Sequence, residues 1–149
     1  MAGLRDTESS KENHQRFVRH LVESELVWGL RNMQGWATCD SNSADSGSVT
    51  LFWSGEPFAK RSRDLEFHDF EPASIPLFDF LFRWLSGMER DGALIGANWT
   101  VDLVGLEYKA IDLKNEIMMA MKPETLNAYR ERLAAELKKT STMRQNEMP

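Results

Sequence analysis

The chain has 149 residues, of which 42% are hydrophobic, and this length suffices for one domain with a core of its own. Its formal net charge of −5 disfavours binding to nucleic acid, which generally requires a positive field. A single cysteine, Cys39, excludes an internal disulfide and a cysteine-based metal centre. Neither a signal peptide nor an apolar segment of membrane-spanning length is apparent, so we expect a cytoplasmic protein without a membrane partner.

The two ends of the chain lack the apolar periodicity of packed helices and strands. We therefore expect residues 1–12 to form a disordered arm and residues 140–149 a disordered tail. Residues 13–139 contain no internal repeat, and no linker rich in Pro, Gly or Ser is long enough to divide them. This organisation predicts a single domain over residues 13–139.

Helical and strand periodicities alternate in the first half of this domain. The expected elements are, in chain order, a helix over 13–24, strands over 26–31, 35–39 and 49–53, and a helix over 57–66. Turn-forming residues between the first two strands predict a hairpin. Ser54 and Pro57 favour the start of the second helix, because serine caps helix N-termini and proline is tolerated in the first turn.

The second half alternates in the same way. The expected elements are a strand over 70–75, a helix over 77–88, strands over 93–99 and 103–109, and helices over 112–121 and 123–139. Pro72 favours an edge position for its strand. The helix over 77–88 is apolar on nearly all sides, which indicates cover on more than one side. Together these elements predict an α+β fold, with a mixed or mostly antiparallel sheet packed by helices and an extra C-terminal helix.

Several short motifs occur in order between residues 52 and 99. They are Phe52-Trp53-Ser54, FEPASIP over 70–76, Phe80 with Arg83-Trp84-Leu85, Asp91-Gly92, and Gly96-Ala97-Asn98-Trp99. By these motifs the chain, from about Phe17 to Met119, resembles the uncharacterised bacterial family catalogued as domain of unknown function 2750. The family often has Val where this chain has Ala97, and an acidic residue where it has Phe78. The resemblance implies a small bacterial cytosolic α+β protein and supplies no activity.

Nucleophilic catalysis finds little support in the sequence. Cys39 lies at the end of a predicted strand, and no neighbour in sequence suggests a lowered pKa, so we interpret it as a packing residue. Neither a G-x-S-x-G nucleophile elbow nor a glycine-rich phosphate-binding loop is present. We expect no catalytic residues and no cofactor.

Metal binding also finds little support. His14 and His20 are six residues apart, which does not place them on one face of a helix. Asp64, Glu66 and His68 would share one face of a strand, but the helix predicted over 57–66 separates the two carboxylates. We interpret this segment as a charged, solvated surface and expect no metal.

The best candidate site combines tryptophan, arginine and asparagine. Trp53 and Trp99 both lie at predicted strand ends, Trp99 beside Asn98, and Arg83 lies within an otherwise apolar helix. Tryptophan and arginine often anchor interfaces, because they combine a large contact area with a polar group. If the strand ends converge, Trp53, Arg83, Asn98 and Trp99 could line a ligand-binding or partner-binding site. Alternatively, the tryptophans are core residues with indole N–H groups bonded to carbonyls, and Arg83 pairs with an acid.

Two surface features indicate possible partners. A basic block at residues 60–63 precedes an acidic stretch over 64–79, which suits either a docking face or an ordinary solvated surface. The C-terminal helix carries a narrow apolar stripe that either docks on its own domain or forms a homodimer. The stripe consists of Leu126, Tyr129, Leu133 and Leu137.

The sequence thus leaves two classes of function open. The first is a non-enzymatic protein–protein interaction module of the accessory, regulatory or immunity type, indicated by the aromatic and arginine content and the lack of a catalytic constellation. The alternative is a small-ligand binding domain, or an enzyme of unassigned activity, that uses the Trp/Arg/Asn cluster. Nucleic-acid binding would depend only on residues 60–63 and the basic C-terminal helix.

Overall fold

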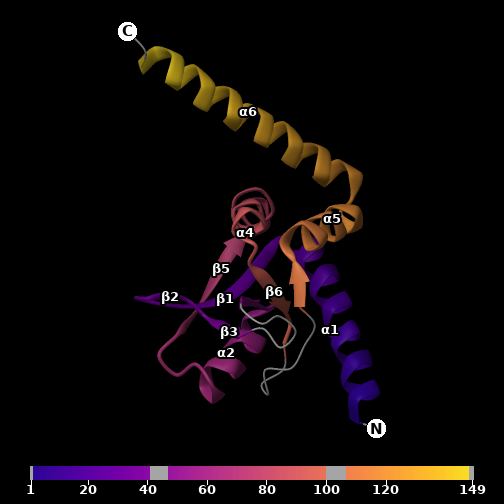
Figure 1. The fold of residues 1–149 in the computed structure, drawn as a ribbon. Coiled ribbons are helices and arrows are strands. Elements are labelled where there is room, and N and C mark those ends of the chain that lie inside the picture. Colours follow the sequence, from indigo (N-terminus) through magenta and orange to yellow (C-terminus); the bar gives the residue numbers. More distant parts are fainter. Residues whose placement is uncertain (1, 41–46, 100–106, 148–149) are drawn as a thin grey trace.

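The computed structural model describes residues 2–40, 47–99 and 107–147 (Figure 1). In chain order, its elements are α1 (Ala2–Ser24), β1 (Leu26–Asn32), β2 (Gly35–Trp36), β3 (Thr38–Asp40), β4 (Ser48–Phe52), α2 (Glu56–Leu65), β5 (Glu71–Pro76), α3 (Leu77–Asp79), the π-helical segment η1 (Phe80–Trp84), α4 (Leu85–Asp91), β6 (Leu94–Ala97), β7 (Glu107–Lys109), α5 (Ala110–Ala120) and α6 (Pro123–Glu147). This order agrees with the predicted one, except that the strand expected over 35–39 is divided into β2 and β3, and the helix expected over 77–88 consists of α3, η1 and α4. Within the strand expected over 103–109, residues 103–106 lie outside the described part of the chain.

The terminal helices are longer than expected. Helix α1 begins at Ala2 rather than near Asn13, and α6 continues to Glu147. Residues 2–12 and 140–147, which we expected to be disordered, therefore continue the neighbouring helices. The physical reason is that an existing helix propagates through polar residues of good helix propensity without needing an apolar stripe. The domain limits at residues 13 and 139 stay a prediction.

The strands form two hydrogen-bonded sheets rather than one. The first has the order β2-β1-β5, and both of its strand pairs are antiparallel. The second has the order β3-β4-β6-β7, in which β4 and β6 are parallel and the other pairs are antiparallel. The α+β class and the mostly antiparallel pairing are confirmed, and β5, which contains Pro72, is an edge strand as expected.

Ala37 explains why there are two sheets. Its N–H donates to the Leu30 carbonyl of β1 at 2.8 Å, and its carbonyl accepts from Leu51 N–H of β4 at 3.2 Å. The segment over 35–39, expected to be one strand, therefore changes partner at Ala37 and divides into β2 and β3. Trp28 of β1 also forms an isolated antiparallel bridge with Trp53, the residue that follows β4.

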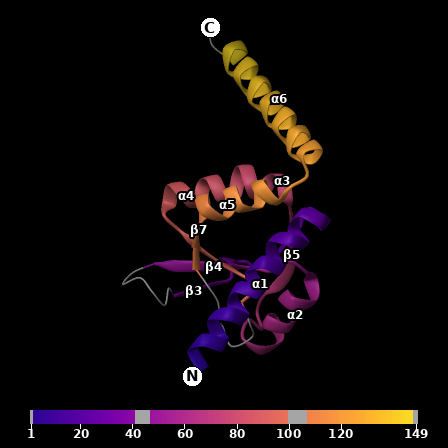
Figure 2. The ribbon, with the colours of Figure 1, turned by 90° about the vertical axis from the view of Figure 1, so that its right-hand side faces the viewer.

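Helices enclose two hydrophobic clusters. The larger cluster joins α1 and α5 to the strands and to the helical segment over 77–91, with Phe17, Phe52 and Leu113 fully buried in it. The smaller cluster, which includes Leu51, Trp53 and Trp99, lies beside α2. Figure 2 shows α1 crossing the strands, α5 beside α4, and α6 leading away from the rest of the molecule. The smaller cluster forms the base of the candidate site.

Candidate functional site

The candidate site lies where the two parallel strands end. Strands β4 and β6 are in register from Val49↔Leu94 to Phe52↔Ala97, so the residues that follow them leave the sheet at the same edge. Ligands in α/β folds bind preferentially at the carboxyl ends of parallel strands, where the following loops diverge. In this protein those loops begin with Trp53 and Asn98.

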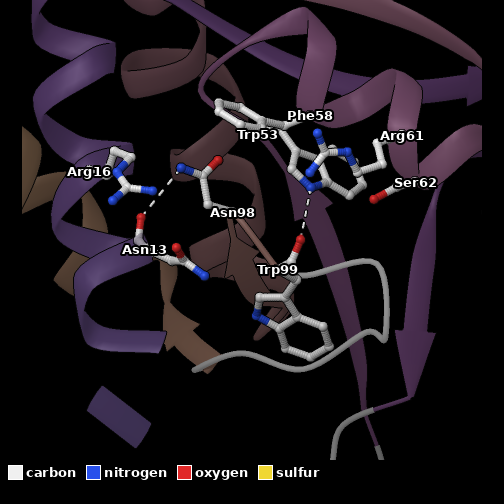
Figure 3. A pocket seen from close by; sticks show the side chains of 8 residues that line it. All are labelled: Asn13, Arg16, Trp53, Phe58, Arg61, Ser62, Asn98 and Trp99. Carbon is white, nitrogen blue, oxygen red and sulfur yellow. Dashed lines mark hydrogen bonds between the residues drawn. The ribbon is translucent and has the colours of Figure 1, made fainter. Parts of the chain in front are cut away.

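A pocket of about 240 Å³ occupies this edge (Figure 3). Two loops and two helices provide its described walls. The lining residues are Trp53 after β4, Asn98 and Trp99 after β6, Asn13 and Arg16 from α1, and Phe58, Arg61 and Ser62 from α2. The α2 residues have the spacing i, i+3 and i+4 and the α1 residues i and i+3, so each set shares one helix face.

Two buried tryptophans form the base of the pocket. Trp53 is 1% exposed and Trp99 is 3% exposed, and the Trp53 indole N–H donates to the Trp99 carbonyl at 3.1 Å. The Trp99 ring packs directly on Gly96: a Cβ atom there would lie 2.6 Å from two of its ring atoms. The position of Trp99 therefore depends on the absence of a side chain at residue 96.

Asn98 connects three elements at the pocket wall. Its backbone has φ +52°, a left-handed conformation that asparagine tolerates better than most residues. The side-chain Oδ1 accepts from Ser54 N–H at 2.8 Å, and Nδ2 donates to Ser54 Oγ at 3.0 Å and to the Asn13 carbonyl at 3.3 Å. Asn98 thus fixes the end of β4 and helix α1 to the end of β6.

Ser54 extends this network to α1. Its hydroxyl is hydrogen-bonded to His20 Nδ1 at 3.1 Å, while Asn98 Nδ2 donates to the same oxygen. Ser54 is only 6% exposed, and its backbone N–H is already used by Asn98. A serine nucleophile needs access to its substrate and free oxyanion donors, so we interpret the Ser54–His20 contact as structural.

The pocket carries two positive charges without an opposing acid. Arg16 and Arg61 are both exposed, and no acidic residue is among the described residues that line the pocket. In Figure 3 the two guanidinium groups point from opposite sides toward Asn98. Elsewhere on α2, Lys60 pairs with Glu56 at 2.8 Å and Arg63 pairs with Glu71 at 3.1 Å. Arg16 and Arg61, by contrast, form no ion pair within the described part of the chain.

The structure brings together three of the four residues that the sequence singles out. Trp53, Asn98 and Trp99 line one pocket, whereas Arg83 lies on η1, away from it. Arg83 pairs there with Asp79 at 3.1 Å and with Glu136 of α6 at 3.2 Å. This agrees with the alternative interpretation, in which Arg83 pairs with an acid and the Trp53 indole bonds to a carbonyl.

Sequence reasoning missed five lining residues, all from helices. They are Asn13, Arg16, Phe58, Arg61 and Ser62. The helical spacing of Phe58, Arg61 and Ser62 was a usable signal, because it places the three side chains on one face of α2. We assigned Arg61 only to a basic surface block, because the sequence does not show which face of α2 turns toward the strand ends.

The remaining titratable residues do not form a second site in the described part of the chain. Burial raises the pKa of the Cys39 thiol, and the charges of Asp40 and Glu66 raise it further, which disfavours a reactive thiolate. His14 is buried, stacks on Tyr108 with ring centroids 3.8 Å apart, and donates to Glu116 at 2.7 Å. Within the described residues there is no group of three or more metal-ligating side chains.

The fold and site together define an α+β domain with a positively charged, aromatic-based pocket at the ends of two parallel strands. The chain belongs to the family described as Protein of unknown function (DUF2750), whose model matches residues 14–117. Neither a curated protein nor a solved structure matches the chain. Among the described helices, none has the length and apolar character needed to cross a membrane.

Proposed function

We propose that the protein binds a compact anionic small molecule in the pocket between α1, α2 and the ends of β4 and β6. The observation that carries the proposal is that Arg16 and Arg61 both line a pocket whose described walls include no acidic residue. This local positive charge occurs in a chain whose net charge is −5. Guanidinium groups present planar pairs of N–H donors that match carboxylate and phosphate oxygens.

The size and walls of the pocket support a ligand that is small and partly aromatic. A volume of about 240 Å³ lies below the range of about 300–1,000 Å³ in which drug-sized ligands bind. Trp53, Phe58 and Trp99 supply aromatic walls, and Phe58 is 38% exposed, so its ring is accessible. A planar ring that carries an acidic group fits both the aromatic walls and the arginines.

The chemistry of the lining favours binding over catalysis. Among its described residues there is no Asp, Glu, His or Cys, the side chains that most often act as general acids, bases or nucleophiles. Besides the arginines and the tryptophan indoles, the polar lining residues are two asparagines, Asn13 and Asn98, and one serine, Ser62. We therefore propose a binding domain without a catalytic step of its own.

Thermal unfolding in the presence of phosphate, acetate, benzoate and phenyl phosphate tests the proposal. A ligand at 100 times its Kd stabilises the fold by about 2.7 kcal/mol, which raises the melting temperature measurably. The double variant Arg16→Ala/Arg61→Ala should weaken binding about 100-fold, because hydrogen bonds to charged groups contribute about 1.5–3 kcal/mol each.

Matched controls are available on the same two helices. Arg19→Ala on α1 and Arg63→Ala on α2 remove the same charge from residues outside the pocket lining and should leave ligand affinity within about twofold. If none of the anions raises the melting temperature at millimolar concentration, or if the double variant binds as tightly as the native chain, the proposal is wrong.

A second candidate function, homodimerisation as part of a protein interaction role, is supported by α6. This helix leads away from the body (Figures 1 and 2), and Leu137 in its distal half is 62% exposed. Its proximal half already packs on the domain through Leu126 and Tyr129. We propose that the exposed stripe pairs with the α6 helix of a second copy. Light scattering should then show a dimer that Leu137→Asp converts to monomer, and a native chain that is monomeric at high micromolar concentration would rule this out.

We also propose a cytoplasmic bacterial location, in keeping with the single cysteine, which is free in the structure. Fractionation of bacterial cells that express the chain tests it. Recovery in the periplasmic rather than the cytoplasmic fraction would contradict it.

A further inference from the structure

Ser62 stands out among the pocket residues because its hydroxyl is buried and unpartnered. The residue is 1% exposed, and its Oγ atom has no hydrogen-bond partner within the described part of the chain. A serine inside a helix usually donates to the carbonyl four residues earlier, here that of Phe58, but this bond is absent. Buried polar groups are nearly always satisfied, so an exception beside a pocket indicates a missing partner.

The other buried or half-buried polar groups at the base of the pocket already have partners. The Trp53 indole donates to a carbonyl, and the Asn98 amide uses both its oxygen and its nitrogen. Two further buried atoms in the described residues lack a hydrogen bond, His14 Nδ1 and Asp79 Oδ1, but neither residue lines the pocket, and Asp79 Oδ1 is ion-paired with Arg83 at 3.1 Å. Among the described residues that line the pocket, Ser62 is therefore the one with a buried side-chain atom that lacks a hydrogen-bond partner.

Ser62 lies on the α2 side of the pocket, opposite Arg16 of α1. Figure 3 shows the Ser62 oxygen on the side of the Trp53 ring, whereas Arg16 approaches from α1 across Asn98. Arg61 precedes Ser62 on α2, and the aromatic side chains of Trp53 and Phe58 line the same region. A ligand whose acidic group binds Arg16 would therefore place its ring beside Trp53, on the side of Ser62.

We infer that the pocket selects a ring acid with a polar substituent: a monocyclic aromatic carboxylate or phosphate whose hydroxyl, amino group or ring nitrogen hydrogen-bonds to Ser62. This inference rests on the proposed anion-binding function and names its ligand class. A serine hydroxyl both donates and accepts, so it suits each of these substituents. Inorganic phosphate would leave the aromatic walls and Ser62 unused, and benzoate would leave Ser62 unpaired.

Isothermal titration of matched ligands tests the inference. The series consists of inorganic phosphate, benzoate, the three monohydroxybenzoates, the three monoaminobenzoates and the three pyridine carboxylates. We expect at least one substituted acid to bind the native chain about tenfold more tightly than benzoate, as a net hydrogen bond allows. In Ser62→Ala this preference should disappear while the affinity for benzoate stays unchanged, and Ser62→Cys, with its weaker donor, should show an intermediate preference.

The comparison is internal to each variant, so a folding defect would lower the affinities of all ligands together rather than their ratio. Arg63→Ala, on the same helix and outside the pocket lining, should keep the native preference. Equal affinities of the native chain for benzoate and all substituted acids, or an unchanged preference in Ser62→Ala, would overturn the inference and leave anion binding intact. Binding of inorganic phosphate alone would also overturn it, whereas failure of every anion to bind would overturn both proposals.

Discussion

Arginine meets aromatic rings in two regions of this molecule, with different outcomes. At the contact between α6 and the helical segment over 77–91, Arg83 pairs with Asp79 and Glu136, and the Arg132 guanidinium lies 3.9 Å from the centre of the Phe78 ring. At the pocket, Arg16 and Arg61 line the same cavity as three aromatic residues, and no acidic residue is among its described lining residues. The comparison shows that carboxylates, rather than arginines or aromatic rings, distinguish the internal contact from the open pocket.

The largest effect is expected at Gly96, where the pocket base is most tightly packed. In Gly96→Ala the new Cβ would lie 2.6 Å from Trp99 and 2.8 Å from Leu51, so both side chains must move. We expect a loss of about 1–3 kcal/mol in unfolding free energy, the usual cost of overpacking, together with loss of ligand binding. Chemical denaturation measures the first effect and titration the second.

Gly87 on α4 provides the matched control for this prediction. A Cβ atom there meets only the end of the Arg90 side chain at 3.7 Å, an ordinary contact. Gly87→Ala should therefore stabilise the protein by about 0.5–1 kcal/mol, the usual gain within a helix. Similar destabilisation by both substitutions would contradict the packing described for Trp99.

Asn98 should show the next largest effect, because it combines backbone conformation with side-chain hydrogen bonds. Asn98→Ala removes the bonds to Ser54 and Asn13 and leaves a residue with a Cβ atom at φ +52°. We expect a loss of about 1–2 kcal/mol, and a smaller loss in Asn98→Gly, since glycine adopts this conformation without strain. Denaturant unfolding of the two variants separates the contributions, and equal losses would show that the conformation costs nothing.

Arg83 should matter much less, and only for the contact with α6. Its guanidinium side chain is 61% exposed, and exposed ion pairs contribute about 0–1 kcal/mol. Arg83→Ala should therefore reduce unfolding free energy by less than about 1 kcal/mol and leave ligand affinity unchanged. An affinity loss comparable to that of Arg61→Ala would break the distinction between the two regions.

The smallest effect near neutral pH is expected from the two tyrosines, since both act only at alkaline pH: Tyr129 lies at the contact with α6, and Tyr108 lies outside the pocket lining. Burial, followed by the charge of Glu116, raises the pKa of Tyr108 from 10.0 to about 12. Burial, followed by the hydrogen bond to Glu25, also raises the pKa of Tyr129 on α6. The folded protein therefore holds these protons more tightly than the unfolded chain, so the stabilisation is complete below pH 10 and is lost as the pH rises toward 12.

Tyr108→Phe should reduce this alkaline loss, because phenylalanine keeps the ring against His14 without a titratable proton. The measurement is the denaturation midpoint as a function of pH from 8 to about 11.5. A native-chain midpoint that is constant above pH 10, or one that falls equally in Tyr108→Phe, would contradict the assignment.

Local patterns in the sequence predicted most of the elements, because periodicity and turn residues act over short distances. They also placed Trp53 and Trp99 at predicted strand ends, but whether those ends converge stayed open, because it depends on which strands are neighbours in a sheet. The hydrogen-bonding change at Ala37 was not predictable from the alanine itself, because it depends on which strands lie on either side. The two-sheet arrangement follows from that tertiary contact.

The helical walls of the pocket could not be predicted for a similar reason. Phe58, Arg61 and Ser62 share one helix face, but the packing of α2 against the smaller cluster decides that this face meets the strand ends. Arg83 illustrates the opposite error. Its position in an apolar helix suggested a functional residue, whereas Asp79, one turn earlier, and Glu136, far along the chain, both pair with it.

Helix α1 has a consequence for how the binding site arises during folding. It supplies Asn13 and Arg16, yet the contacts that hold it in place join Asn13 to Asn98 and His14 to Glu116, which are 85 and 102 residues apart. Closing loops of this length costs conformational entropy and slows folding, so α1 completes the pocket only after the segments that carry Asn98 and Glu116 are in place. If the pocket binds an anion as proposed, binding reports that α1 has docked, because undocking of α1 would remove Asn13 and Arg16 from the pocket together with Phe17 from the larger cluster.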